Sequence, residues 1–206
     1  MISVGELSES KLRLAPLPNP NYLCSLCRPK SHTMITIICG TNRKNSVSKK
    51  IAHLYKNILK SKGQEAEIIH LEQMPDDVIA SSLYENSGSN NEFNELRQKM
   101  YDSKKMVFIV PEYNGSFPGV LKVFIDGLKF PGTFKNKKCA LVGLSSGVQG
   151  AGLALSHLTD IFNYCGTHVL ALKPKLSRIE ENLTENSLSK LYNELLEEQA
   201  EMFIEF

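Results

Sequence analysis

Five short, near-continuous runs of apolar residues recur along the chain, and a stretch of different character separates each run from the next. The runs occupy residues 35–39, 66–71, 106–110, 139–144 and 169–172. Runs that are apolar throughout predict strands buried on both faces, because a strand with one wet face alternates apolar and polar side chains. Strands of this kind alternating with helices predict an α/β protein with a doubly wound parallel sheet and helices on both faces.

The helices are predicted from apolar residues spaced three and four apart. They are expected over residues 47–59, 92–103, 120–128, 152–165 and 188–196. Gly63 is expected to end the first helix, since glycine readily adopts the left-handed conformation that follows many helices. The polar, turn-rich segment 74–91 is expected to be a long loop with about one helical turn.

Length and charge narrow the class of protein. A chain of 206 residues is long enough for one α/β domain with a sizeable core. A net charge of +2 gives no basis for attraction to nucleic acid or to a membrane surface. Cys39, Cys139 and Cys165 lie in apolar stretches, as reduced core thiols do, so a cytoplasmic location is expected.

Residues 1–33 differ from the rest of the chain because they show no periodicity and no strand. We interpret them as an irregular extension that the domain does not need, and place the domain itself at residues 34–206. Cys24 and Cys27, with His32 nearby, have the spacing of half a zinc site. Zinc takes four protein ligands in structural sites, and no second pair follows, so no metal site is predicted.

Parallel sheets bind ligands at the carboxyl ends of their strands, which directs attention to three turns. The first, "GTNRKNSVS" at residues 40–48, offers the hydroxyl groups of Thr41, Ser46 and Ser48 and the guanidinium of Arg43. The first free N–H groups of the following helix point into the same space, which suits a phosphate monoester. The alternative is that Ser46 merely caps the helix.

The second turn, "PEYNGS" at residues 111–116, follows the third predicted strand. Asn114 and Gly115 form a strong turn pair, and Gly115 allows a ligand to approach the backbone closely. A plain connecting loop is the alternative, although it does not explain why Glu112 and Tyr113 immediately follow a buried strand.

The third turn, "SSGVQG" at residues 145–150, follows the fourth predicted strand. The hydroxyl groups of Ser145 and Ser146 and the loop amides at Gly147 and Gly150 could meet the edge of a flat polar ring. A glycine-rich connecting turn without a ligand is the alternative.

From residue 34 to about residue 172 the chain resembles the NADPH-dependent FMN reductase family, which includes quinone, azo-dye and chromate reductases. The resemblance rests on "GTNRKNS", "PEYNGSFPGVLKVFIDGL" and "SSGVQGAG", in that order. It implies a flavodoxin-like fold with a five-stranded parallel sheet in the order 2-1-3-4-5. It also implies non-covalently bound FMN, with the phosphate in the first turn and the isoalloxazine ring bordered by the other two.

The residues that match the family's three binding turns are the candidate cofactor-binding residues. They are Thr41, Arg43, Ser46, Ser48, Pro111, Glu112, Tyr113, Asn114, Gly115, Ser145, Ser146, Gly147 and Gly150. No catalytic side chain is predicted, because in such proteins the cofactor carries the chemistry.

The resemblance implies an oxidoreductase that takes a hydride from NADPH or NADH and reduces a small acceptor by a ping-pong mechanism. The acceptor would be a quinone, an azo compound, a flavin or a metal oxyanion, and the assembly a homodimer or homotetramer. The alternative is a flavodoxin-type electron carrier without turnover of its own. Such carriers are strongly acidic, whereas this chain has a net charge of +2.

Overall fold

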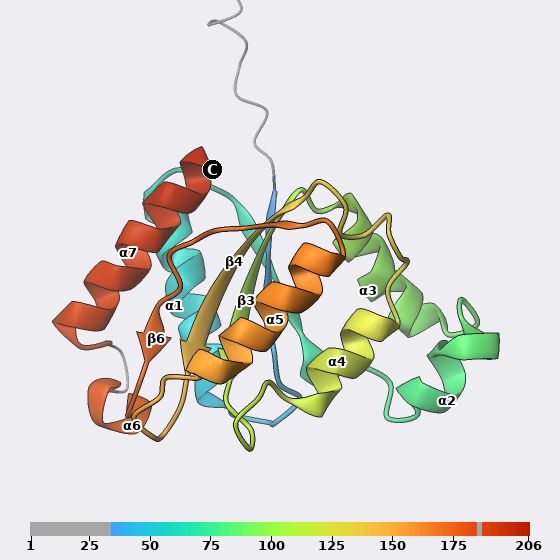
Figure 1. Ribbon diagram of the computed structural model, residues 1–206, viewed down its shortest axis with the longest axis horizontal. Coiled ribbons are helices and arrows are strands. Elements are labelled where there is room, and N and C mark those ends of the chain that lie inside the picture. Colours follow the sequence, from blue (N-terminus) through green and yellow to red (C-terminus); the bar gives the residue numbers. More distant parts are fainter. Residues whose placement is uncertain (1–33, 185–186) are drawn as a thin grey trace, which may run out of the picture. The chain divides into compact units, whose positions relative to one another are not determined.

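The computed structural model describes residues 34–184 and 187–206. The expectations for residues 1–33, including the spacing of Cys24 and Cys27, lie outside the described residues. Within the described part, the chain forms one parallel sheet between two layers of helices (Figure 1).

The sheet follows the predicted order and has one strand more than predicted. Its strands run in the order β2-β1-β3-β4-β5, with β6 paired to β4. The strands are β1 (Ile35–Cys39), β2 (Ala66–His70), β3 (Lys105–Pro111), β4 (Lys138–Leu144), β5 (His168–Val169) and β6 (Lys175–Leu176). Every strand pair is parallel, so all the strands have their carboxyl ends at one edge, the lower edge in Figure 1.

The outer edge of the sheet beyond β4 differs from the single strand predicted at residues 169–172. β5 pairs with the first two residues of β4, whereas β6 pairs with the last two. Pro174 lies just before β6 and has no N–H to donate, although its carbonyl accepts from the N–H of Gly143 at 2.9 Å. The edge strand is therefore interrupted, and β6 reaches the carboxyl edge of the sheet.

The helices cover the two faces of the sheet. α1 (Val47–Ser61) and α7 (Lys190–Glu205) pack on one face, and α3 (Asn91–Asp102), α4 (Gly119–Asp126) and α5 (Gly152–Tyr164) pack on the other. The predicted long loop 74–91 is more helical than expected, with α2 (Val78–Ser82) and η3 (Tyr84–Asn86), and the 3-10 turn η2 (Leu71–Gln73) precedes it. A short helix, α6 (Ile179–Asn182), was not predicted.

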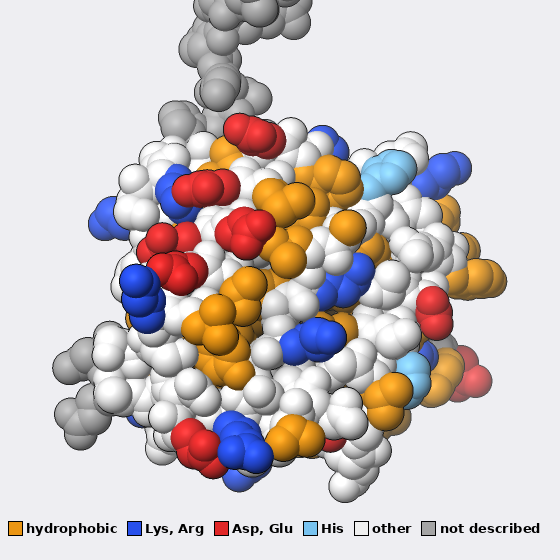
Figure 2. All heavy atoms as spheres, turned by 60° about the vertical axis from the view of Figure 1, so that its left-hand side comes forward, with side chains coloured by type: hydrophobic (Ala, Val, Ile, Leu, Met, Phe, Trp, Pro, Cys, Tyr) orange, Lys and Arg blue, Asp and Glu red, His pale blue; other side chains and the backbone are white. Residues whose placement is uncertain are grey.

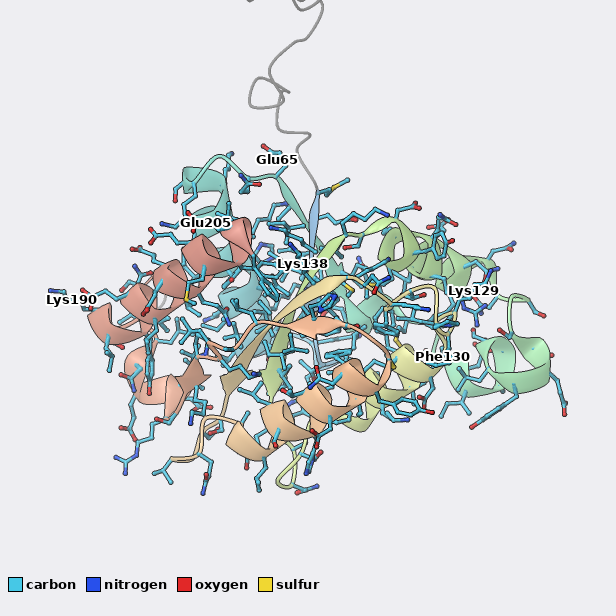
Figure 3. All side chains as sticks on the ribbon, turned by 45° about the horizontal axis from the view of Figure 1, so that its top comes forward. Glu65, Lys129, Phe130, Lys138, Lys190 and Glu205 are labelled. Carbon is cyan, nitrogen blue, oxygen red and sulfur yellow. The ribbon has the colours of Figure 1, made fainter. Side chains whose placement is uncertain are left out.

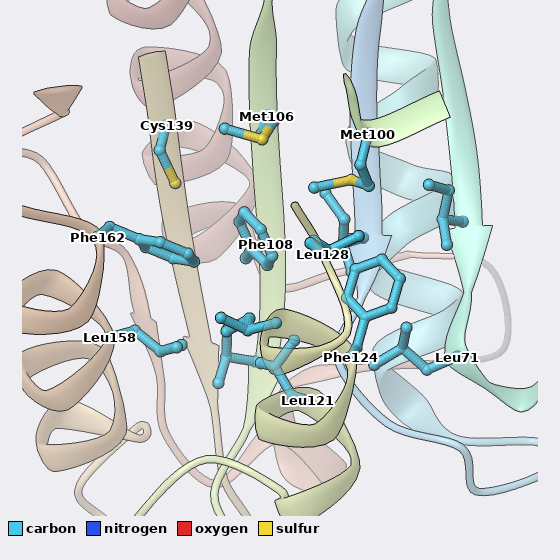
Figure 4. Packing of buried hydrophobic residues seen from close by; sticks show 14 of the residues in the cluster. Leu71, Met100, Met106, Phe108, Leu121, Phe124, Leu128, Cys139, Leu158 and Phe162 are labelled. Carbon is cyan, nitrogen blue, oxygen red and sulfur yellow. The ribbon is translucent and has the colours of Figure 1, made fainter. Parts of the chain in front are cut away.

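Two hydrophobic clusters explain why the central strands are apolar throughout. Side chains of β3 alternate between them, with Phe108 and Val110 on the α3–α4–α5 side and Val107 and Ile109 on the α1–α7 side. Figure 4 shows Phe108 beside Phe162 of α5, and their ring centroids are 4.7 Å apart. The buried sheet therefore holds the strand ends firmly.

The last helix is held against the sheet by polar as well as apolar contacts. The buried Gln199 of α7 donates to the carbonyls of Leu141 at 2.9 Å and Leu172 at 2.8 Å. Lys105 donates to the carbonyls of Phe203 and Ile204, both at 2.8 Å, and Lys138 (labelled in Figure 3) donates to that of Phe206. Cations at these carbonyls also complement the negative end of the helix dipole.

Within residues 34–184 and 187–206, no helix combines the length and the apolar character needed to cross a membrane.

Candidate cofactor site

Three loops meet at the carboxyl edge of the sheet because β1, β3 and β4 are neighbours in register. Cys39 at the end of β1 lies opposite Ile109, and Pro111 at the end of β3 lies opposite Leu144. The loops after these strands cover residues 40–46, 112–118 and 145–151, so the three turns singled out in the sequence come together in space.

The loops enclose a hollow of about 200 Å³. The predicted site residues that line it are Thr41, Arg43, Ser46, Ser48, Pro111, Glu112, Tyr113, Ser145 and Ser146. Hydroxyl groups, backbone amides and one guanidinium therefore converge on a space large enough for a phosphate and a short polar chain.

The first loop turns sharply out of the sheet at Gly40. A Cβ atom there would lie 2.9 Å from the carbonyl oxygen of Ile109, so only glycine fits without displacement. The oxygen of Ser46 accepts from the N–H of Lys49 at 3.3 Å and caps α1. This satisfies the capping interpretation, and because the cap uses only the oxygen of Ser46, its hydroxyl hydrogen can donate either to Cys39 or to a ligand. Capping and ligand binding are compatible at this residue.

Positive charge lies at the rim of the first loop. Arg43 and Lys44 are exposed, line the hollow and take part in no ion pair within the described part of the chain. Lys49 is engaged instead by Glu72 at 2.5 Å, and the hydrogen bond from Lys49 holds the pKa of Glu72 below its ordinary value. Two carboxylates, those of Glu112 and Glu180, also line the hollow, so Arg43, Lys44 and the positive end of the α1 dipole favour an anion only beside the first loop.

The second loop is a tight hairpin. The N–H of Tyr113 donates to the carbonyl of Ser116 at 2.8 Å, and the N–H of Ser116 donates back at 3.0 Å. Asn114 and Gly115 have φ angles of 52° and 76°, the signature of a two-residue type I′ turn. The phenol of Tyr113 shares a hydrogen bond of 2.8 Å with the hydroxyl of Thr41, which joins the second loop to the first.

The third loop is held by its own side chains and by α6. The hydroxyl of Ser145 donates to the carbonyl of Gly147 and accepts from the N–H of Gly150, both at 2.9 Å. The hydroxyl of Ser146 donates to the carboxylate of Glu180 at 2.8 Å. Ser145 thus shapes the loop, and Ser146 connects it to the far wall of the hollow.

Four predicted site residues do not line the hollow. Asn114 and Gly115 form the tip of the hairpin, and Gly147 lies in the open part of the third loop. Gly150 is buried against β6, where a Cβ atom would lie 2.7 Å from the carbonyl carbon of Lys175. Packing against β6 therefore accounts for a glycine at position 150.

Six residues of the lining are not among the predicted site residues. They are Lys44, Asn45, Val47, Leu144, Ile179 and Glu180. The first four adjoin predicted residues, whereas Ile179 and Glu180 come from α6, far along the chain. The only sequence signal for α6 is the pair of apolar residues Leu176 and Ile179, both buried in the structure.

Cys39, at the foot of the first loop, is buried. Burial raises the pKa of its thiol, and the hydrogen bond with Ser46 opposes this only in part. A thiol with a raised pKa is a weaker nucleophile at neutral pH than an exposed thiol.

Fold and site together define a flavodoxin-like α/β protein with a polar hollow, lined by hydroxyl groups and two basic side chains, at the carboxyl edge of its sheet. Residues 33–174 match the model of the NADPH-dependent FMN reductase family. The chain belongs to this family, whose members are oxidoreductases.

Curated relatives agree with this assignment. The chain is 28% identical over 161 residues to a 2-hydroxy-1,4-benzoquinone reductase from a Burkholderia species, covering 72% of this chain and 82% of the relative. It is 31% identical over 132 residues to an FMN-dependent NADPH-azoreductase of Staphylococcus aureus, covering 61% of this chain and 66% of that one.

Solved structures support the fold. The flavoenzyme NAD(P)H:(acceptor) oxidoreductase FerB from Paracoccus denitrificans matches with a TM-score of 0.67 and 24% identity, over 84% of this chain and 96% of that chain. An FMN-dependent NADH-azoreductase from Bacillus anthracis, solved in complex with FMN, matches with a TM-score of 0.55 and 15% identity, over 82% and 97% of the two chains.

The packing of the third loop leads to a prediction about stability. Gly150→Ala should lower the free energy of unfolding by about 2–4 kcal/mol, because the new methyl group meets the β6 backbone and φ at this position is +55°. Gly147→Ala is the matched control in the same loop, since no atom lies within 4 Å of its added Cβ, and it should change stability by less than about 1 kcal/mol. Urea unfolding measures both, and equal small effects would show that the loop does not pack on β6.

Proposed function

We propose that this chain is an FMN-dependent oxidoreductase that takes a hydride from NADPH or NADH and reduces a small-molecule acceptor. The observation that carries the proposal is the convergence of three loops on one polar hollow at the carboxyl edge of the sheet. Membership of the NADPH-dependent FMN reductase family supports the same conclusion.

The hollow suits the phosphate end of FMN. Arg43 would pair with the phosphate, and Ser46, Ser48 and the first N–H groups of α1 would donate hydrogen bonds to it. A volume of about 200 Å³ is below the roughly 300–1,000 Å³ of complete small-molecule sites. We therefore assign the phosphate and its chain to the hollow, and the flat ring to the hairpin and third loop at its mouth.

The redox chemistry, which is uptake of a hydride from the nicotinamide and transfer of two electrons to the acceptor, would be supplied by FMN when it is bound. The chain's own residues bind and orient. Tyr113 and Thr41 keep the hairpin next to the phosphate loop through their shared hydrogen bond, and the backbone of Asn114 and Gly115 presents polar groups at the tip. We assign no proton transfer to a side chain of the hollow.

The acceptor is proposed to be a quinone, an azo compound, a flavin or a metal oxyanion. Two relatives are named for the reduction of a benzoquinone and of azo compounds, both of which contain flat conjugated groups. A flat acceptor can lie against a flat ring, as the nicotinamide does. This makes a flat conjugated molecule the first substrate to try.

The proposal also covers the location of the protein in the cell, its partners and its oligomeric state. Reduced thiols at Cys39, Cys139 and Cys165 support a cytoplasmic location. Figure 2 shows acidic, basic and hydrophobic side chains interspersed on one face, a mixture that favours neither nucleic acid nor a membrane as partner. We propose a homodimer or homotetramer, as the family resemblance implies.

Arg43→Ala tests the assignment of the phosphate. It should weaken FMN binding about tenfold or more, because a charge-assisted hydrogen bond contributes roughly 1.5–3 kcal/mol, and should leave riboflavin binding unchanged. Flavin fluorescence quenching measures both affinities. Lys50→Ala removes an exposed cation of α1 outside the hollow and is the control. An equal loss for FMN and riboflavin in Arg43→Ala would mean that Arg43 does not meet the phosphate.

Steady-state kinetics test whether NADPH and the acceptor bind in turn at one site beside the flavin. The proposed ring-binding loops all lie at one edge of one sheet, so the nicotinamide and the acceptor would reach the flavin from the same side and take turns. Initial rates with NADPH varied at several fixed concentrations of a benzoquinone should give parallel double-reciprocal lines. Converging lines would show that both substrates bind together and that a second pocket exists.

A further inference from the structure

The hairpin at Tyr113–Ser116 has too few internal bonds to hold its own position. Its two strands exchange only the two backbone hydrogen bonds between Tyr113 and Ser116. An isolated two-stranded hairpin is at best marginally stable in water. The direction in which its tip points must therefore be set by contacts with other elements.

Two side-chain hydrogen bonds provide such contacts, one at each end of the hairpin. Tyr113 binds Thr41 of the first loop at 2.8 Å, 72 residues away in the chain. Ser116 binds Nδ1 of His157 at 2.9 Å, 41 residues away. The hairpin is thus held between the phosphate loop on one side and α5 on the other.

We propose that His157 is a positioning residue, which acts through Ser116 to fix the orientation of the Asn114–Gly115 tip toward the flavin ring. This inference rests on the proposed function, because the tip is assigned to the ring there. His157 lies outside the lining of the hollow and outside the three turns that the sequence indicated.

The location of His157 suits this role. Its neighbours on α5, Ala154 and Leu158, are fully buried in the core, so the helix that carries the imidazole is fixed to the sheet. The imidazole itself is exposed and leaves the core unaffected. A change at this residue should therefore alter the hairpin without unfolding the protein.

The hydrogen bond between the Ser116 hydroxyl and Nδ1 of His157 can form with either atom as the donor. Nδ1 accepts from the hydroxyl of Ser116 when it lacks a proton and donates to the same oxygen when it carries one, since a hydroxyl can do both. The contact therefore persists in each protonation state of His157, and its role is geometric.

Three substitutions at His157 test whether the position of its hydrogen-bonding atom matters, or the imidazole ring itself. His157→Ala removes the bond. His157→Asn keeps a hydrogen-bonding atom on Cγ, where Nδ1 is attached, whereas His157→Gln carries its amide one carbon further out. His168→Ala, at an exposed histidine of β5 near the opposite edge of the sheet, controls for the loss of an imidazole.

The first measurement needs no flavin. Solvent exchange of the Ser116 amide, followed by NMR, reports the backbone bond from Ser116 to Tyr113. His157→Ala and His157→Gln should speed this exchange about threefold to tenfold, the range expected for one exposed hydrogen bond. His157→Asn and His168→Ala should match the wild type.

The second measurement uses the protein with FMN bound. His157→Ala should weaken FMN and riboflavin by the same factor, about threefold to tenfold, and shift the visible absorption band of the bound flavin. Ser116→Ala should produce the same changes, and the double variant should add nothing further, since both residues serve one bond.

Unchanged Ser116 exchange in His157→Ala, or an unchanged flavin spectrum, would overturn the inference, as would failure of His157→Asn to restore both. A wild type that binds no FMN gives a different result. It would overturn the proposed function and the role toward the ring, while the exchange measurement would still decide whether His157 holds the hairpin.

Discussion

The parallel register of three buried strands determines where this protein can bind a ligand. β1, β3 and β4 lie side by side in parallel register, and helices cover their apolar side chains on both faces. Their carboxyl ends therefore stay together, and each is followed by a loop rich in hydroxyl groups, amides or glycine. At Gly40, where the chain leaves β1, the backbone lies so close to the carbonyl of Ile109 that a side chain does not fit.

Hydrogen bonds between the loops convert this proximity into a site. The N–H of Glu112 donates to the carbonyl of Leu144 at 3.0 Å, which joins the second loop to the end of β4. Thr41 and Tyr113 join the first loop to the second, and Ser146 and Glu180 join the third loop to α6. The hollow is thus closed by contacts between segments far apart in the sequence, and a polar ligand meets groups that are already oriented, which lowers the entropy lost on binding.

Much of the fold could be predicted from periodicity because each long element buries a clear apolar face. The bounds of β1 were predicted as the structure has them, and the start of α1 at Val47 and of α5 at Gly152 likewise. β6 and α6 could not be predicted, since two-residue and four-residue elements carry no periodic pattern and exist only through pairing with β4 and packing beside the third loop. The hollow shows the same division: most of the residues predicted within the turns line it, whereas Glu180 and His157 reach the turns only through the tertiary fold.

The central claim is that the hollow at the carboxyl edge holds FMN, and reconstitution measures it directly. The full chain would be titrated with FMN while flavin fluorescence is followed, and then freed of excess flavin for a visible absorption spectrum. The account predicts quenching that saturates at one FMN per chain, with a flavin spectrum that remains with the protein and is released intact on denaturation, as non-covalent binding requires. Absence of binding at micromolar protein after reconstitution would contradict the account.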